Sequence, residues 1–426
     1  MTLSGIGRIS RAFVVSMAVV LGMSACGGYT VGFMWVTGTQ YNQIAGFKID
    51  DYTGNLTNMV NSPYSSGGSN PVSIVVKVGG NFVFVVNKGT FNSHGVSNGD
   101  GNVAVFAVGE DGILTFEATY STAGNTPVWA TTDTTGSFLY VLDSRSPAYG
   151  TTVNGVLDLN GDITVFAIDP NTGRLQIVPN QEQKIPLGQP GAGQQLNYFE
   201  VGPAPTMLRA GGACLFTLDS GDQTIFPYGI GSSGQLTVEA NSRYYTNAVN
   251  LTSIYVSGNS VFLTDAGSTL SPGGAIIPLS GGGAGCSLSA QADGEVANLV
   301  PAANLAQTYQ PVYAMTSSNN KFLYILNRNS TNSNYANSTI SAFVIQSTGA
   351  LVPISDPENP YPVGNGPDCM VEDPSNQYIF TSNSNDGSVT GKYINQNTGQ
   401  LSDLTRGSTF PATGLATCLA VSGNVD

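Results

Sequence analysis

The sequence predicts an all-β protein, a seven-bladed β-propeller whose ring is closed by its two chain ends. Three observations support this prediction. A short apolar run recurs seven times, a second run with a glycine-containing turn follows each copy, and the copies are spaced about 57 residues apart. One such unit cannot bury its own faces, so we expect the seven units to stack radially as blades.

The first run of each unit is rich in aromatic and β-branched residues, as β-strands are. Most copies end in Asn or Asp. In the clearest unit, residues 138–143 are followed by an irregular insert and then by residues 163–178, which read as two strands joined by a turn. The copy around residues 273–288 is the most degraded. The seven first runs begin at Phe33, Phe82, Phe138, Cys214, Ser260, Phe322 and Tyr378.

A further strand opens most units just after a proline, as at Pro127, Pro311 and Pro367. The unit at Phe33 lacks such a strand, whereas residues 411–422 resemble one and have no unit after them. We therefore expect the C-terminal strand to become the innermost strand of the first blade, beside residues 33–37. Closing the ring in this way protects sheet edges that would otherwise aggregate.

The first 26 residues are predicted to be a lipoprotein signal peptide, which leaves the propeller in residues 27–426. Arg8 and Arg11 precede an apolar run too short to span a bilayer, as in secretory signals. Residues 23–27 resemble the lipobox of bacterial lipoproteins, in which the cysteine, here Cys26, is lipidated. We expect an extracytoplasmic protein anchored to a bacterial membrane, in the periplasm or at the cell surface, by lipid on Cys26. Ordinary signal cleavage is the alternative.

The charge balance argues against nucleic acid as a partner. The chain has 14 Lys and Arg against 27 Asp and Glu, a net charge of −13. Loss of Arg8 and Arg11 with the signal would make it more acidic still. Such a surface repels nucleic acid and anionic lipid, and no basic run overrides it.

The remaining cysteines have different expected roles. Cys214 stands where sister strands carry Phe or Tyr, so we expect a small buried hydrophobic residue. Cys369 and Cys418 fall in innermost strands of neighbouring blades, and an oxidising envelope would permit a disulfide between them. The sequence leaves that pairing open because it does not give the Cα separation. No pair of Cys-x-x-Cys motifs indicates structural zinc.

The long insertions are expected on one face of the propeller. They include residues 88–101, 144–161 and 328–338 between second and third strands, and residues 180–202 and 290–310 between blades. These loops are rich in Asn, Ser, Gly and Tyr, a composition that suits the binding of a glycan, a protein or a small molecule. Simple solvated loops are the alternative.

The repeat resembles the seven-bladed lactonase-like propeller family, which includes a 6-phosphogluconolactonase type. The strand at 138–143, the element at 163–175 and the inner strand after proline carry this resemblance, which extends over residues 30–424. All three elements are structural. The resemblance implies histidine, arginine and acidic residues at the mouth of the channel, but His94 is the one histidine and no histidine-containing family motif can be carried over.

Two functional hypotheses follow. The favoured one is a lipid-anchored binding module that uses its long-loop face without chemistry. The other is a lactone hydrolase, which needs an activated water and support for an oxyanion. His94 is the candidate base, with Arg145 or Arg328 as the anion stabiliser. A neutral lactone is expected, since a phosphate would need more cations than the chain offers.

Two fragments place oxygen ligands at alternate positions, as calcium loops do: Asp158, Asn160 and Asp162, and residues 98–102. Neither ends in the glutamate of an EF-hand loop, and the same residues are ordinary turn formers. Calcium is therefore an open hypothesis. No other cofactor is expected.

Overall fold

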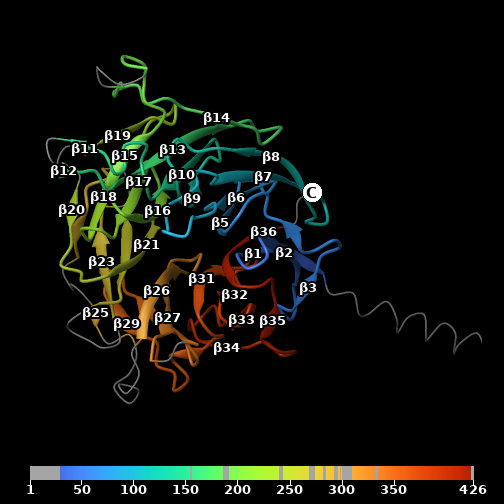
Figure 1. Cartoon of the computed structure of the whole chain (residues 1–426). Helices are drawn as coiled ribbons and strands as arrows, with labels where there is room; N and C mark the ends of the chain where they lie inside the picture. Colours follow the sequence, from blue (N-terminus) through green and yellow to red (C-terminus); the bar gives the residue numbers. More distant parts are fainter. Residues whose placement is uncertain are drawn as a thin grey trace, which may run out of the picture.

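The computed structural model describes residues 29–153, 156–185, 191–238, 243–267, 274–281, 285–291, 296–297, 299, 309–331 and 334–423. Their strands form seven antiparallel sheets arranged as blades around a ring (Figure 1). The predicted signal peptide and Cys26 lie outside the described residues. Within the described residues, no helix has the length and apolarity needed to cross a membrane.

Each blade has four main strands, here called A to D from the innermost outward. Blade 1 is β36 (Ala416–Gly423), β1 (Thr30–Gly38), β2 (Gln43–Asp50) and β3 (Leu56–Asn58). The other blades, in the same order of strands, are blade 2, β5 (Pro71–Val76), β6 (Phe82–Asn87), β7 (Asn102–Val108) and β8 (Leu114–Tyr120); blade 3, β9 (Pro127–Thr132), β10 (Phe138–Asp143), β13 (Asn160–Ile168) and β14 (Leu175–Ile177); blade 4, β16 (Pro205–Gly211), β17 (Cys214–Asp219), β18 (Thr224–Ile230) and β19 (Leu236–Val238); blade 5, β21 (Leu251–Ser257), β22 (Ser260–Asp265), β23 (Ala275–Ser280) and β24 (Ser289–Ala290); blade 6, β26 (Tyr309–Thr316), β27 (Phe322–Asn329), β28 (Thr339–Ile345) and β29 (Leu351–Pro353); and blade 7, β31 (Pro367–Glu372), β32 (Tyr378–Asn383), β33 (Ser388–Ile394) and β34 (Leu401–Asp403).

The outer edge of most blades carries one more short strand, which pairs with strand C beside strand D. A small hairpin also lies in the insert of blade 3. These strands are β4 (Tyr64–Ser65), β15 (Phe199–Pro203), β20 (Tyr244–Tyr245), β25 (Val296–Ala297), β30 (Tyr361–Pro362) and β35 (Thr409–Pro411), with the hairpin β11 (Thr152–Val153) and β12 (Val156–Leu157).

The predicted ring closure is confirmed. Strand β36 pairs antiparallel with β1, with Trp35 opposite Ala420, and the two ends of the colour scale meet in this blade (Figure 1). The Thr37 hydroxyl also donates a hydrogen bond to the Cys418 carbonyl at 3.0 Å. The closing strand begins at Ala416, because Pro411 ends β35 of blade 7 instead.

Neighbouring blades are locked together where strand B begins. The aromatic residue at this point packs on the glycine in the C–D turn of the next blade. A Cβ on Gly173 would lie 2.5 Å from the Phe82 ring, and the φ of Gly173 is 65°. Gly54 meets Tyr378 in the same way. The turn thus requires glycine for its backbone conformation and for the space it leaves.

Cys214 occupies this aromatic position in blade 4 and is buried, as predicted, but the sequence did not predict that it forms a disulfide. The structure joins it to Cys286 in the C–D connection of blade 5, with a Cα separation of 5.4 Å. The disulfide thereby replaces the aromatic–glycine contact between two blades. Cys369 and Cys418 also form a disulfide, with Cα atoms 5.1 Å apart, which links blade 7 to blade 1.

Removing the second bridge is expected to destabilise the protein. The double variant Cys369→Ser/Cys418→Ser frees two chain positions 49 residues apart in the unfolded state. We expect the free energy of unfolding to fall by about 2–4 kcal/mol, measured by denaturant unfolding under oxidising conditions. An unchanged unfolding midpoint would show that the bridge adds nothing to ring closure.

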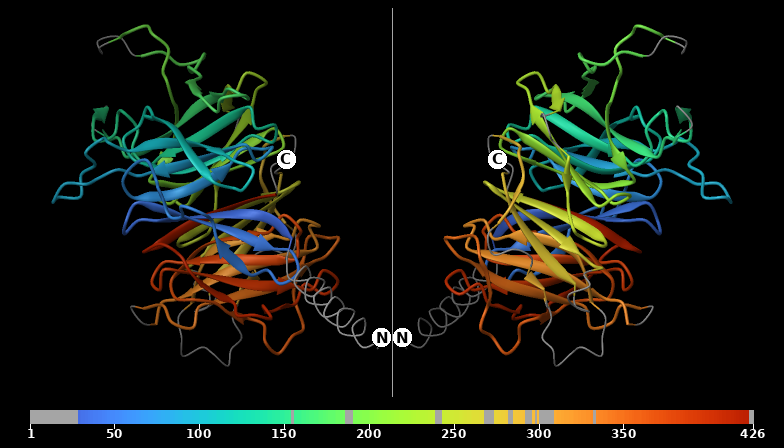
Figure 2. Two further views of the ribbon diagram at one scale, coloured as in Figure 1. Left: turned by 90° about the vertical axis from the view of Figure 1, so that its right-hand side faces the viewer. Right: turned by 90° about the vertical axis from the view of Figure 1, so that its left-hand side faces the viewer.

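The excursion at residues 178–198 does not lie where the sequence predicted. It leaves strand D of blade 3 and returns as β15, and both β14 and β15 pair with β13. It therefore interrupts the outermost strand, and its described residues, 178–185 and 191–198, project from the rim rather than from the long-loop face (Figures 1 and 2). A bridge between Lys184 and Gln195 holds its two arms together.

Candidate functional site

The seven A strands surround a central channel, and its long-loop mouth holds a cavity of about 700 Å³. The second residue of several A strands lines this cavity. Because these residues occupy the same position in their blades, they form a ring of side chains around the cavity. It includes Val72, Val128, Thr206, Asp368 and Thr417.

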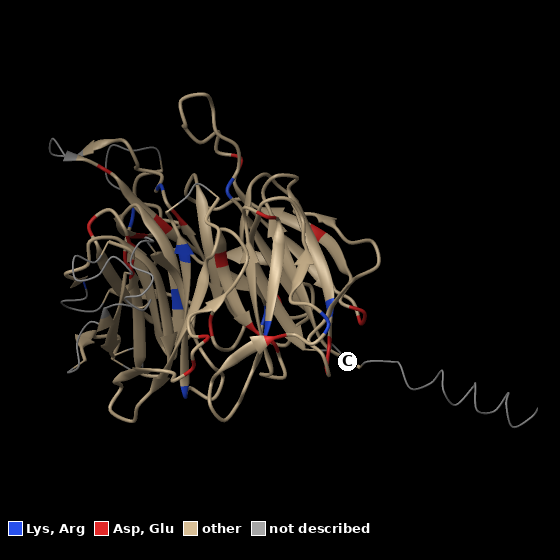
Figure 3. Ribbon diagram, turned by 90° about the horizontal axis from the view of Figure 1, so that it is seen from below, with Lys and Arg blue, Asp and Glu red and all other residues tan. Residues whose placement is uncertain are grey.

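Three basic residues come to this mouth from the ends of B strands. Lys88 directly follows β6, Arg145 follows β10 by two residues, and Arg328 lies near the end of β27. Lys88 and Arg145 line the cavity, and neither takes part in an ion pair of the described residues. Few Lys and Arg residues occur on the ribbon as a whole, and they are scattered over several blades (Figure 3). A protein that is acidic overall thus presents positive charge here.

Each of these cations stacks on an aromatic ring from its own insert. Such contacts are favourable because the ring face is negative, and they fix the start of each loop beside the channel. These loop aromatics are therefore partly structural. The pairs are Lys88 with Phe91 at 5.5 Å, Arg145 with Tyr149 at 5.0 Å and Arg328 with Tyr335 at 5.1 Å from the ring centroid.

Asp368 is the acidic group of this mouth. Arg328 pairs with its carboxylate and donates another hydrogen bond to the Pro367 carbonyl at 3.1 Å. Burial raises the pKa of Asp368, although the Arg328 charge opposes the shift. Burial also lowers the pKa of Lys88, and repulsion from Arg145 adds to this effect. An anion bound between Lys88 and Arg145 would relieve their repulsion.

His94 lies away from these groups. It is in an exposed turn of the blade 2 insert, where its backbone N–H donates to Asn92 Oδ1 at 2.9 Å. Its ring Nδ1 is 3.4 Å from the Ser93 hydroxyl, and it is not among the residues that line the cavity. The structure therefore brings Arg145 and Arg328 to the channel mouth but leaves His94 on the outer loop.

Sequence reasoning missed Lys88 and Asp368. Aligning the repeats would have found both, since Lys88 and Arg328 each follow the buried asparagine that ends a central apolar run. Asp368 stands at a position where the other A strands carry Val or Thr. A charged residue in one blade at a position that is uncharged in the other blades therefore indicates a candidate site residue.

Asp158 and Asp100 of the two candidate calcium fragments accept ordinary hydrogen bonds, whereas both carboxylate oxygens of Asp162 have no partner. Asp158 Oδ1 accepts the backbone N–H of Asn160 at 2.8 Å, and Asp162 lies buried in β13 opposite Asp143. In the second fragment, Asp100 accepts the Thr90 N–H at 2.7 Å. The part of the chain that the structure describes has no group of three or more His, Cys, Asp or Glu that could hold a metal ion. Calcium remains a prediction.

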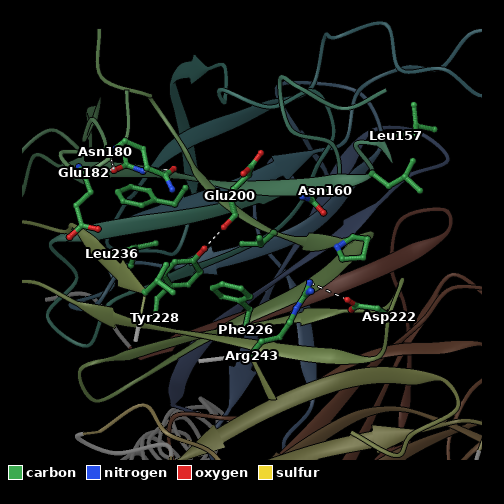
Figure 4. A pocket seen from close by; sticks show the side chains of 16 residues that line it. Leu157, Asn160, Asn180, Glu182, Glu200, Asp222, Phe226, Tyr228, Leu236 and Arg243 are labelled. Atoms are coloured by element: carbon green, nitrogen blue, oxygen red, sulfur yellow. Dashed lines mark hydrogen bonds and ion pairs between the residues drawn. The ribbon is translucent and has the colours of Figure 1, made fainter. Parts of the chain in front are cut away.

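Another cavity, of about 530 Å³, lies between blades 3 and 4 (Figure 4). Its one arginine, Arg243, pairs with Asp222 at 3.1 Å, and the Tyr228 hydroxyl donates to the Glu200 carbonyl. Arg243 and Asp222 therefore neutralise each other, whereas Glu182 and Glu200 take part in no ion pair of the described residues. Its lining comes from blade 3, including β15, and from blade 4.

The strands define a seven-bladed β-propeller whose channel opens at the long-loop face into a cavity lined by polar and charged side chains. The chain belongs to the lactonase seven-bladed β-propeller family, whose model matches residues 30–192 and 281–416. No curated protein matches the sequence.

Solved structures show the same fold. A candidate 6-phosphogluconolactonase from Bacteroides fragilis is 18% identical, with a TM-score of 0.66 over 92% of this chain and 98% of that one. A periplasmic gluconolactonase from Pseudomonas aeruginosa is 16% identical, with a TM-score of 0.64 over 92% and 99% of the two chains. At these identities the likeness concerns the fold alone.

Proposed function

We propose that this protein is an extracytoplasmic lactone hydrolase that opens a sugar lactone at the long-loop mouth of its channel. The observation that carries the proposal is the half-buried Asp368 carboxylate, which lines the same cavity as Lys88 and Arg145. Membership of the lactonase family supports the reaction class. The periplasmic location of the Pseudomonas aeruginosa gluconolactonase supports the compartment.

The proposed reaction adds water across the ester bond. Asp368 accepts a proton from a water molecule while the oxygen of that water attacks the lactone carbonyl carbon. Arg145 stabilises the resulting oxyanion. The C–O bond to the ring oxygen then breaks. That oxygen takes the proton from Asp368, which leaves a hydroxy acid. Arg328 acts as a positioning residue because it holds the Asp368 carboxylate.

The positive charge at the mouth suits the carboxylate product, which Lys88 would also contact. A neutral lactone remains the first substrate to test. A phosphorylated lactone is the other substrate to test, because Lys88, which the sequence did not suggest, lines the same cavity as Arg145.

Binding without turnover is the second candidate function. One observation favours it: Asp368 is already paired with Arg328, which stabilises the charged carboxylate and lowers its basicity. A glycan or a protein would then use the aromatic-anchored loops.

Turnover by matched variants tests the proposal. With glucono-1,5-lactone and related aldonolactones, we expect ring opening faster than the spontaneous rate. Asp368→Asn is expected to lower kcat about 10²–10⁴-fold, and Arg145→Gln about 10²-fold. The exposed Arg406 supplies the control Arg406→Gln, which should keep full activity.

His94→Ala belongs in the same series, since His94 is the base that the sequence suggested. Loss of activity in this variant with full activity in Asp368→Asn would transfer the role of base to His94. A wild-type protein no faster than the spontaneous reaction, together with measurable ligand binding, would replace the hydrolase with the binding module.

The lipid anchor on Cys26 is part of this proposal and rests on the lipobox-like residues 23–27. Cys26→Ser is expected to release the protein from the membrane fraction. Retention of that variant in membranes would overturn the anchor.

A further inference from the structure

The opposite mouth of the channel holds a second cavity, of about 590 Å³. It lies where A strands run into the short A–B turns, away from the basic residues described above. Residues from all seven blades line it. The ones that bear on its chemistry are Trp129 from β9, Arg209 from β16, Tyr255 from β21, Tyr313 from β26 and Glu372 from β31.

Arg209 sits among three aromatic rings. Its guanidinium carbon is 5.1 Å from the Trp129 ring centroid, 5.3 Å from Tyr313 and 5.9 Å from Tyr255. It donates hydrogen bonds to the Tyr313 hydroxyl and, at 3.4 Å, to the Ile254 carbonyl. None of the ion pairs among the described residues includes Arg209. The rings thus hold the guanidinium in place and leave its charge without a carboxylate.

Trp129 provides an unused donor next to it. The side chain is only 9% exposed, and its indole N–H has no acceptor. Buried donors in proteins are nearly always satisfied, so such a group requires an explanation. The other tryptophan, Trp35, follows the rule, since its indole N–H donates to the Gly112 carbonyl at 3.1 Å.

Glu372 completes the set. One carboxyl oxygen accepts the Ser318 N–H at 2.7 Å, and the other is buried without a partner. Burial, with a smaller contribution from the charge of Asp373, raises the pKa of Glu372 to about 7. Tyr255 and Tyr324 also face this carboxyl from β21 and β27. Near neutral pH the group can therefore donate as well as accept a hydrogen bond.

We propose that this cavity is a binding site for a small hydroxycarboxylic acid of the sugar-acid class. Its carboxylate would accept hydrogen bonds from Arg209 and the Trp129 indole N–H, a hydroxyl would bond to the free oxygen of Glu372, and its carbon skeleton would pack on the aromatic rings. The site is separate from the proposed hydrolytic site and does not depend on turnover there.

The unpaired charge of Arg209 and the two unsatisfied groups, the Trp129 N–H and one Glu372 oxygen, select this class of ligand. A neutral sugar would leave the Arg209 charge without a counter-ion. A phosphate dianion would bring a second negative charge toward Glu372 and Asp373, with a single guanidinium to balance it. A monocarboxylate with hydroxyl groups satisfies all three groups together, and the aromatic surface accepts the C–H face of a polyol chain.

The indole N–H signals test the site directly. The chain has two tryptophans, so protein labelled with ¹⁵N-tryptophan gives two such signals, and Trp129→Phe assigns them without removing a protein hydrogen bond. With sodium gluconate as probe, we expect a saturable shift of the Trp129 signal and none of the Trp35 signal. Methyl glucoside, which lacks the carboxylate, should produce no shift. Affinity should fall as the pH rises through about 7 and Glu372 becomes charged.

Variants at the two mouths locate the ligand, because Trp129 borders both cavities. Arg209→Gln should raise the Kd at least tenfold, whereas Arg145→Gln, at the other mouth, should change it less than twofold. A shift that survives Arg209→Gln, a shift lost in Arg145→Gln, or no shift at tens of millimolar gluconate would each overturn the proposal. Because these experiments measure binding of gluconate, their outcome does not depend on whether the protein hydrolyses lactones.

Discussion

Deleting residues 412–426 should abolish the cooperative unfolding transition of the whole propeller. Strand β36 is the innermost strand of blade 1 and lies between β31 and β5 of the flanking blades. Its loss leaves the β1 edge unpaired and removes Cys418 from its disulfide. The truncation also removes the hydrogen bond that the Thr417 hydroxyl donates to the Pro71 carbonyl of blade 2 at 2.8 Å.

The expected loss of folding stability is larger than the contribution of one blade, because the truncation disrupts both interfaces of blade 1 with its neighbours. Folded domains are stable by only about 5–15 kcal/mol, so the truncated chain should show aggregation, dye binding to exposed apolar surface and no sigmoidal melt. Calorimetry and size-exclusion chromatography measure this. Removal of residues 424–426 alone leaves β36 intact and is the matched control. A melting temperature equal to wild type in the longer truncation would refute ring closure as the source of stability.

The second large effect is expected at a buried pair of acids in blade 3. Asp143 and Asp162 face each other on β10 and β13, and neither has exposed surface. Asp143 Oδ1 accepts the Thr122 hydroxyl at 2.9 Å and the Thr126 N–H at 3.1 Å. The other Asp143 oxygen and both Asp162 oxygens have no partner.

Blade 2 shows how the same positions are satisfied without acids. There Asn87 and Asn102 are opposite each other, and Asn87 Nδ2 donates to Asn102 Oδ1 at 3.0 Å. In blade 3, burial raises the pKa of Asp143 to about 8. Burial, with repulsion from Asp143 and Glu200, raises the pKa of Asp162 well above its ordinary value. The pair is therefore expected to hold a proton at neutral pH.

The direction of the pH dependence follows from these shifts. A folded state that binds a proton more tightly than the unfolded state loses stability as the pH rises from the ordinary carboxyl pKa through about 8. We expect the wild-type melting temperature to fall between pH 5 and pH 9. Asp143→Asn supplies a hydrogen-bond donor for Asp162, as in blade 2. We expect this variant to be more stable than wild type at pH 8 by roughly 2 kcal/mol, and its melting temperature to fall less with pH.

Thermal unfolding across this pH range measures the effect. Asp111→Asn, which alters an acid with 70% side-chain exposure, should keep the wild-type slope. A less stable Asp143→Asn protein at pH 8, or an unchanged slope, would contradict the assignment of a shared proton.

The sequence predicted the architecture because each blade repeats a complete local signal of strand, turn and strand. The ring closure followed from one strand missing at Phe33 and one left over at the other end. The bridge between Cys214 and Cys286 was missed because the degraded fifth repeat gave Cys286 no position in a blade. The rim excursion at 178–198 was misplaced because a split outer strand has no distinct sequence pattern.

The candidate sites were harder to predict because the channel collects residues that are distant in sequence. Arg145 and Arg328 were recognised as loop-face cations, but Asp368 was not connected with them. Arg209 and Glu372 went unnoticed, since each is one charge in an otherwise apolar strand. They come to line one cavity only when four successive A strands, from β16 to β31, are placed around one axis.

The pH–rate profile of lactone opening, corrected for the spontaneous reaction, tests the proposed function most directly when wild type is compared with Asp368→Asn. Because burial raises the pKa of Asp368, the wild-type rate should increase with pH through a pKa above the ordinary aspartate range, and the variant should lose both the rate and this dependence. A variant that keeps the wild-type rate and profile would contradict the assignment of Asp368 as the base.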